Sequence, residues 1–157
     1  MAEDPHLSIT RRIAAPRSAV WRCWTEPALL MQWYCPKPWQ VTEAEIDLRP
    51  GGRMSVVMAG PEGERIDAPG MMLEVVPGER LVFTDAMTAG FIPAGEPFMV
   101  GHVTLTDDGD GTRMVWGARH WTTQARDRHL AMGYEAGWNA AADQLDALAQ
   151  SLARAAA

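Results

Sequence analysis

The feature that most constrains the fold of this chain is a C-terminal run with helical periodicity, from Thr122 to about Ala155. Its apolar side chains recur at steps of three or four residues, which places them on one face of a helix. They are Leu130, Tyr134, Trp138, Ala141, Leu145, Leu148 and Leu152. At about 1.5 Å per residue, roughly thirty helical residues span about 45 Å, the width of a small domain. We therefore predict one long helix with a buried face, around which the preceding chain folds.

Two glycines, Gly133 and Gly137, interrupt the first half of this predicted helix. Each costs about 1 kcal/mol relative to alanine inside a helix, so their presence requires a reason. One reason is the close approach of a strand backbone, and the other is space for a ligand beside Tyr134 and Trp138. The sequence favours neither.

The chain before this helix reads mainly as β-strands. Alternating or apolar runs occupy residues 6–14, 41–48, 53–58, 71–76, 81–86, 98–107 and 112–120. Two short helices are predicted between the first two runs, over residues 15–25 and 27–33, because Pro16 and Pro27 suit a first helical turn. Gly- and Pro-rich turns between the later runs predict consecutive antiparallel pairing. The fold class is therefore α+β, with a seven-stranded curved antiparallel sheet wrapped round the long C-terminal helix.

Several short motifs extend along the chain in an order typical of one family. They are Arg12-x-x-Ala15-Pro16-x-x-x-Val20-Trp21-x-x-Trp24-Thr25-x-Pro27, Leu48-Arg49-Pro50-Gly51-Gly52-Arg53, Glu74-Val75-x-Pro77-x-x-Arg80-Leu81-x-Phe83-Thr84, Gly111-Thr112-Arg113 and Gly137-Trp138-x(6)-Leu145-Asp146-x-Leu148. Together they resemble the bacterial stand-alone branch of the activators of heat-shock-protein-ninety ATPase, within the SRPBCC superfamily, also called START or birch-pollen-allergen-like. The resemblance covers about residues 7–152, and we expect residues 1–157 to form a single domain of this type.

The resemblance implies the helix-grip fold, with a cavity between the curved sheet and the long helix. Members of the superfamily bind or transform hydrophobic small molecules, whereas the bacterial branch mostly lacks assigned substrates. The eukaryotic co-chaperones of the family have a further N-terminal domain, which the motifs here do not include. A contact with the chaperone is therefore not expected.

Composition excludes several other classes of function. The net charge is −6 and the basic residues are scattered, so nucleic acid is not an expected partner. No apolar run approaches the roughly 18 residues of a membrane span, and the first ten residues lack the features of a secretory signal. We expect a cytoplasmic protein. Cys23 and Cys35 lack the spacing of a metal or redox motif, and no nucleotide, hydrolase or metalloprotease motif is present, so no cofactor or metal is expected.

Strand parity predicts which side chains face the helix, because alternate residues point to opposite faces of a sheet. With the residues near the two glycines, these form the predicted ligand-binding set: Met54, Val56, Met58, Met72, Phe83, Asp85, Phe91, Met99, Trp116, His120, Gly133, Tyr134, Gly137 and Trp138. Phe91 is assigned as cover, because it lies in the long connection 87–97, which is predicted to form a lid. His102 falls on the outward parity and is expected to be a surface residue, and His6 and His129 belong to no recognisable cluster.

Three functions stay open at this point. The first is binding of a hydrophobic small molecule without catalysis. The second is a cyclase, dehydratase or hydrolase acting on a polyketide-like or aromatic substrate, with His120 and Asp85 as candidate acid and base. The third is a co-chaperone-like interaction module. A homodimer also stays open, because no sequence feature argues for or against it.

Overall fold

The computed structural model describes residues 4–157 and contains the predicted elements in the predicted order. The strands are β1 (His6–Ile13), β2 (Gln40–Ile46), β3 (Met54–Ala59), β4 (Arg65–Ala68), β5 (Met71–Val76), β6 (Arg80–Thr84), β7 (Met87–Thr88), β8 (Ile92–Pro93), β9 (Val100–Asp108) and β10 (Gly111–Arg119). The helices are α1 (Arg17–Thr25), α2 (Pro27–Leu30), α3 (Thr123–Ala131) and α4 (Tyr134–Ala156). All seven predicted strands are present, and β4, β7 and β8 are additional short ones. No helix within residues 4–157 is long and apolar enough to cross a membrane.

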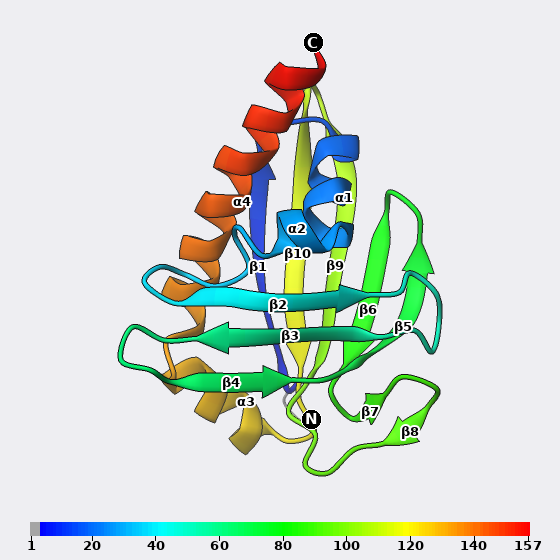
Figure 1. The fold of residues 1–157 in the computed structure, drawn as a ribbon, viewed down its shortest axis with the longest axis vertical. Helices are drawn as coiled ribbons and strands as arrows, with labels where there is room; N and C mark the ends of the chain where they lie inside the picture. Colours follow the sequence, from blue (N-terminus) through cyan, green and yellow to red (C-terminus); the bar gives the residue numbers. More distant parts are fainter. Residues whose placement is uncertain (1–3) are drawn as a thin grey trace.

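The strands form a five-stranded antiparallel sheet, in the order β1-β10-β9-β6-β5, and a three-stranded sheet, in the order β2-β3-β4. In Figure 1 the three-stranded sheet crosses the long strands at a steep angle, while α4 runs alongside β1. A single bridge between Arg53 and Met71 joins the two sheets. The predicted curved sheet is thus confirmed in its antiparallel pairing, but it is divided where the chain changes direction.

Gly70 lies at this junction of the two sheets. A Cβ atom added there would lie 2.8 Å from the carbonyl oxygen of Met54 and 2.8 Å from that of Thr84. The amide of Met54 also donates a hydrogen bond to the Gly70 carbonyl oxygen, at 3.0 Å. Both oxygens belong to the backbone, which cannot rotate away as a flexible side chain could. The two sheets can therefore approach this closely only because residue 70 has no side chain.

Substitution Gly70→Ala is expected to destabilise the protein by about 2–3 kcal/mol, the usual cost of overpacking a rigid site. For a chain of this length, that corresponds to a loss of roughly 5–10 °C in melting temperature, measured by calorimetry. The matched control is Gly95→Ala, since a Cβ at Gly95 has no atom within 4 Å. Equal melting temperatures for the two variants would contradict the close approach of the sheets.

The predicted long C-terminal helix is interrupted, and in this respect the prediction was wrong. Gly133, between α3 and α4, has a φ of 89°, a left-handed conformation that glycine adopts without strain. The hydroxyl of Thr122 caps α3 by accepting a hydrogen bond from the amide of Ala125, at 3.0 Å. Because α3 departs from the direction of α4, Leu130 does not continue the buried stripe and is 42% exposed.

The core beneath α1 and α4 is built from aromatic rings. Trp24 makes edge contacts with Trp33 and Trp116, at ring-centroid distances of 4.7 and 5.2 Å. Trp116 in turn stacks on Trp138 of α4, at 4.2 Å. Both cysteines, Cys23 and Cys35, are buried free thiols, in agreement with a packing role. The buried Trp24, Trp33 and Trp116 thus fill the space where the short helices meet the sheet.

Candidate functional site

A cavity of about 660 Å³ lies between the three-stranded sheet, the five-stranded sheet and the α3–α4 junction. This volume falls in the usual range for sites that bind small molecules. Its wall consists of Tyr34, Cys35, Pro36, Met54, Val56, Met58, Ile66, Asp67, Ala68, Pro69, Gly70, Phe83, Thr84, Asp85, Ala94, Gly95, Glu96, Phe98, Met99, Trp116, His129, Met132, Gly133, Tyr134, Gly137, Trp138 and Ala141. The seven tryptophans and ten methionines therefore do not fill the interior completely.

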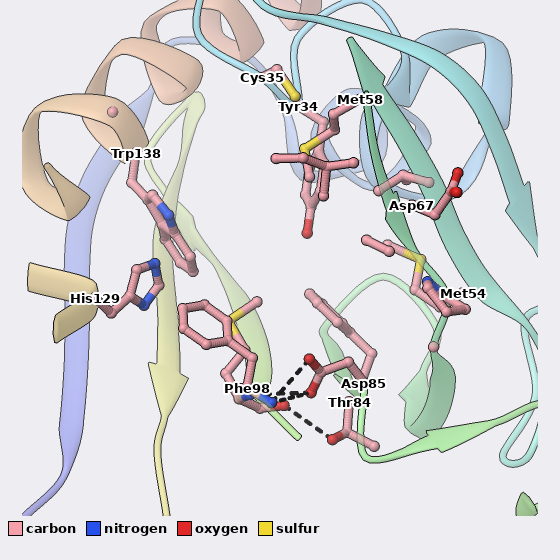
Figure 2. A pocket seen from close by; sticks show the side chains of 18 of the residues that line it. Tyr34, Cys35, Met54, Met58, Asp67, Thr84, Asp85, Phe98, His129 and Trp138 are labelled. Carbon is pink, nitrogen blue, oxygen red and sulfur yellow. Dashed lines mark hydrogen bonds between the residues drawn. The ribbon is translucent and has the colours of Figure 1, made fainter. Parts of the chain in front are cut away.

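The cavity has two chemically different walls. Figure 2 shows Met54 and Met58 on one side, with Trp138 and His129 across the open space from them. The methionine side is flexible and polarisable, whereas the opposite side presents aromatic rings. The hydroxyl of Tyr34 points into the space between them in Figure 2. Burial raises the pKa of this phenol, so it stays protonated at neutral pH and can donate a hydrogen bond.

Most of the predicted ligand-binding residues line this cavity, but Met72, Phe91 and His120 do not. Met72 is fully buried in the core, beside an irregularity in the pairing of β5 with β6. His120 is buried and contacts His129, which lines the cavity in its place. The predictions that Met72 and His120 line the cavity and that Phe91 covers it were therefore wrong. Ligand binding by the other residues stays a prediction.

Phe91 does not cover the cavity. It has a φ of 64° at the turn between β7 and β8 and is 58% exposed. Its ring lies over Gly51, where an added Cβ would be only 2.5 Å from the ring. The connection as a whole nevertheless borders the cavity, because Ala94, Gly95 and Glu96 belong to its wall. The apolar tip of the loop is thus fastened to the β2–β3 turn instead of the cavity mouth.

The two glycines of the predicted helix have different roles. Gly133 supplies the left-handed residue that separates α3 from α4. A Cβ at Gly137 would meet only the Cγ of Pro36, at 4.0 Å, so no strand backbone approaches it. Of the two readings weighed for Gly137, close backbone approach is wrong. The space beside this glycine is part of the cavity.

Asp85 anchors the long connection instead of presenting a free carboxylate. Its two oxygens accept hydrogen bonds from the Phe98 amide, at 2.8 and 3.0 Å, and Oδ1 also accepts from the Met99 amide, at 3.1 Å. The neighbouring Thr84 hydroxyl donates to the Met99 carbonyl oxygen, at 3.0 Å. Figure 2 shows these bonds at the base of the cavity. The residues 86–98 are therefore fastened to the end of β6.

Substitution Asp85→Ala is expected to cost about 1–3 kcal/mol, since it leaves two amides without their charged acceptor. The effect should be concentrated in residues 86–98, whose amides should lose hydrogen-exchange protection measured by mass spectrometry. Asp110→Ala is a control, because Asp110 is fully exposed and its one partner among the described residues 4–157 is Arg12. Unchanged exchange in residues 86–98 of Asp85→Ala would contradict the anchoring role.

The histidines form two pairs that the sequence did not indicate. His120 Nε2 lies 2.9 Å from His129 Nδ1, and His6 Nε2 lies 2.7 Å from His102 Nε2. His129 brings α3 against the end of β10 and lines the cavity with its ring. Burial, together with the nearness of His120, lowers the pKa of His129 to about 4. His129 is thus neutral at neutral pH.

The second pair lies outside the cavity wall. His102 is on the outward parity, as predicted, but it is only 8% exposed because its ring covers Gly117 and meets His6. Burial, followed by His6, Arg80 and Arg119, lowers the pKa of His102 to about 4. The expectation of a surface histidine was therefore wrong.

A helix-grip fold with a cavity beside its last helix defines the class of protein, and comparison with known proteins gives the family. The family model described as activator of Hsp90 ATPase homolog 1-like protein matches residues 14–150. The chain belongs to this family, which confirms the resemblance found in the sequence motifs. A comparison with curated proteins gave no match.

Solved structures agree with this assignment. The chain is 36% identical to protein NE0264 from Nitrosomonas europaea, over 96% of this chain and 97% of that one, with a TM-score of 0.92. It is 29% identical to protein Ms6760 from Mycobacterium smegmatis, over 92% and 90% of the two chains, with a TM-score of 0.78. An AHSA1-like protein from Aeromonas hydrophila, 21% identical over 94% and 93%, shares the fold with a TM-score of 0.71.

Proposed function

We propose that this chain binds a hydrophobic small molecule in the cavity between the sheets and α4. The observation that carries the proposal is an unfilled volume of about 660 Å³ walled largely by methionine and aromatic side chains. An apolar occupant gains about 25 cal/mol for each Å² of apolar surface removed from water, so 200 Å² contributes about 5 kcal/mol before the costs of association. Membership of a family in which hydrophobic ligands are common supports the same function.

The enzymatic alternative has less support from the geometry. His120 does not line the cavity, and the Asp85 carboxylate is occupied by the amides of Phe98 and Met99. No hydrogen bond joins the two side chains among those of residues 4–157. The proposed acid and base are thus not brought together at a common substrate position. The interaction-module alternative gives no reason for an interior cavity.

Gly137 offers a direct way to test binding. A side chain added there extends into open space, and replacing glycine inside a helix also improves helix stability. We expect Gly137→Phe to fold with an unchanged or higher melting temperature and to weaken binding of 2-methoxynaphthalene, an uncharged lipophilic probe, at least tenfold. The measurement is isothermal titration calorimetry.

The matched control is Gly137→Ala, whose methyl group leaves most of the cavity open. It should raise the free energy of unfolding by about 0.5–1 kcal/mol and retain probe binding. A wild-type protein that binds no lipophilic probe, or a Gly137→Phe variant that binds it as tightly as wild type, would overturn the proposed function.

A further inference from the structure

The ring of His129 is a buried polar group with one nitrogen left without a partner. His129 is only 7% exposed and belongs to the cavity wall. Its Nδ1 is engaged by His120 Nε2, at 2.9 Å, whereas its Nε2 has no hydrogen-bond partner within residues 4–157. This Nε2 is not among the fully enclosed side-chain atoms without a partner in residues 4–157, so it stays accessible from the cavity. An accessible, unpaired nitrogen on the wall can form a hydrogen bond with a molecule in the cavity.

The contact between His120 and Pro5 indicates which ring nitrogens of the His120–His129 pair carry protons. His120 Nδ1 faces the carbonyl oxygen of Pro5 at 3.4 Å, and a carbonyl oxygen can only accept. The proton of His120 therefore lies on Nδ1, which leaves a lone pair on its Nε2. His129 must then donate from Nδ1, and its own Nε2 carries a lone pair. The group presented to a cavity occupant is thus a hydrogen-bond acceptor.

The surroundings of His129 narrow the chemical class of the occupant. The ring centroids of Phe98, Tyr134 and Trp138 lie 4.7, 5.0 and 5.7 Å from that of His129. Such rings favour a planar aromatic partner, by stacked or edge contacts. Among the residues that the structure describes, the charged side chains of the wall are all acidic, namely Asp67, Asp85 and Glu96, and none is a lysine or arginine. A carboxylate or phosphate would meet like charge without a compensating cation.

We propose that His129 Nε2 accepts a hydrogen bond from the hydroxyl group of an uncharged aromatic ligand, so that the cavity selects phenol-like molecules over their ethers and over anionic lipids. The inference rests on the proposed function and adds the polar group that the ligand must carry. His120 is a positioning residue in this arrangement, because it fixes the proton of His129 without touching the ligand.

Three naphthalenes of similar size test the inference on the wild-type protein. 2-Naphthol offers a hydroxyl donor, 2-methoxynaphthalene lacks it, and 2-naphthoate is an anion. Calorimetry at neutral pH should give 2-naphthol binding about tenfold tighter than 2-methoxynaphthalene, which corresponds to about 1.4 kcal/mol, and little or no binding of 2-naphthoate. Equal affinities for the first two would overturn the inference but leave the proposed function standing. Failure of all three to bind would overturn both.

The variant His129→Phe keeps a ring on the wall but removes the acceptor. It should bind 2-naphthol and 2-methoxynaphthalene equally, while the control His6→Phe, in the histidine pair outside the cavity wall, keeps the tenfold preference. If His129→Phe does not fold, ¹⁵N NMR of wild-type histidine side chains still decides the matter. The expected tautomer of His129 is protonated at Nδ1, and a proton on Nε2 in the free protein would overturn the inference.

Discussion

Lowering the pH from about 6.5 to about 4 is expected to destabilise the folded protein by several kcal/mol. His102 and His129 each have a pKa of about 4 in the folded state, lowered from 6.5 chiefly by burial. Between these two values the unfolded chain binds protons that the folded chain does not, so stability falls as the pH falls. Each shift corresponds to about 3 kcal/mol.

The surroundings of both histidine pairs also shift the pKa values of their other members, His6 and His120. Burial also lowers the pKa of His6 and that of His120. Arg119 near His6 and Arg126 near His120 act in the same direction. Asp4 raises the pKa of His6, and the hydrogen bond with the Pro5 carbonyl raises that of His120. A doubly protonated pair would have no acceptor, so protonation breaks the contact between the rings.

Urea unfolding followed at pH 7, 5.5 and 4.5 measures the effect. The double variant His6→Gln with His102→Gln removes one pair and should show a shallower fall in the free energy of unfolding over this range, with the His120–His129 pair still present. A wild-type protein whose free energy of unfolding is the same at pH 7 and pH 4.5 would be incompatible with buried neutral histidines.

Replacing Trp24 by alanine is expected to cost about 3–5 kcal/mol, the usual range for removing a large buried ring. Trp24 is 0% exposed and contacts Trp33, Tyr34, Phe83 and Trp116 through its ring. A loss of this size lowers the melting temperature by roughly 10 °C or more in a chain of this length.

The indole nitrogen of Trp24 gives this prediction a second part. Trp24 Nε1 is buried without a hydrogen-bond partner in the described part of the chain, so replacing the indole by a phenyl ring loses no hydrogen bond. Trp24→Phe should therefore cost clearly less than Trp24→Ala, about 1–2 kcal/mol from the lost volume. Trp121→Ala is the control, since Trp121 is 54% exposed and should change stability by less than about 0.5 kcal/mol. A cost for Trp24→Phe equal to that of Trp24→Ala would contradict the account of the indole.

The architecture could be predicted from sequence because its signals are local. Strand parity correctly places Met54 and Trp116 at the cavity, and the apolar stripe from Tyr134 to Leu152 matches α4. The strand β4 was missed because its four residues, Arg65–Ala68, show no regular alternation and are mostly exposed. The break at Gly133 was visible only as a glycine in a helical pattern, and sequence alone cannot tell an interrupted helix from a continuous one with space beside it.

The polar part of the candidate site could not be predicted, because it depends on tertiary contacts. His120 was placed toward the cavity by parity, but α3 turns back against β10 and puts His129 in between. Gly133 follows α3 and separates it from α4, so this glycine was the sequence signal that could have indicated a separate helix carrying His129. Asp85 was assigned by strand parity at the start of the long connection, and Phe91 by its place within that connection. Their actual partners, the amides of the loop and the surface of Gly51, are distant contacts without a sequence signature.

The most direct test of the central claim, an open cavity that accepts an apolar molecule, is methyl NMR of the protein labelled at its methionines. Met54, Met58 and Met99 line the cavity, whereas Met71, Met72 and Met114 are buried outside its wall. Titration with 2-methoxynaphthalene should shift the methyl signals of the first three and leave the other three nearly unchanged. Saturating probe that moves none of the first three, or moves all six equally, would contradict the presence of this binding cavity.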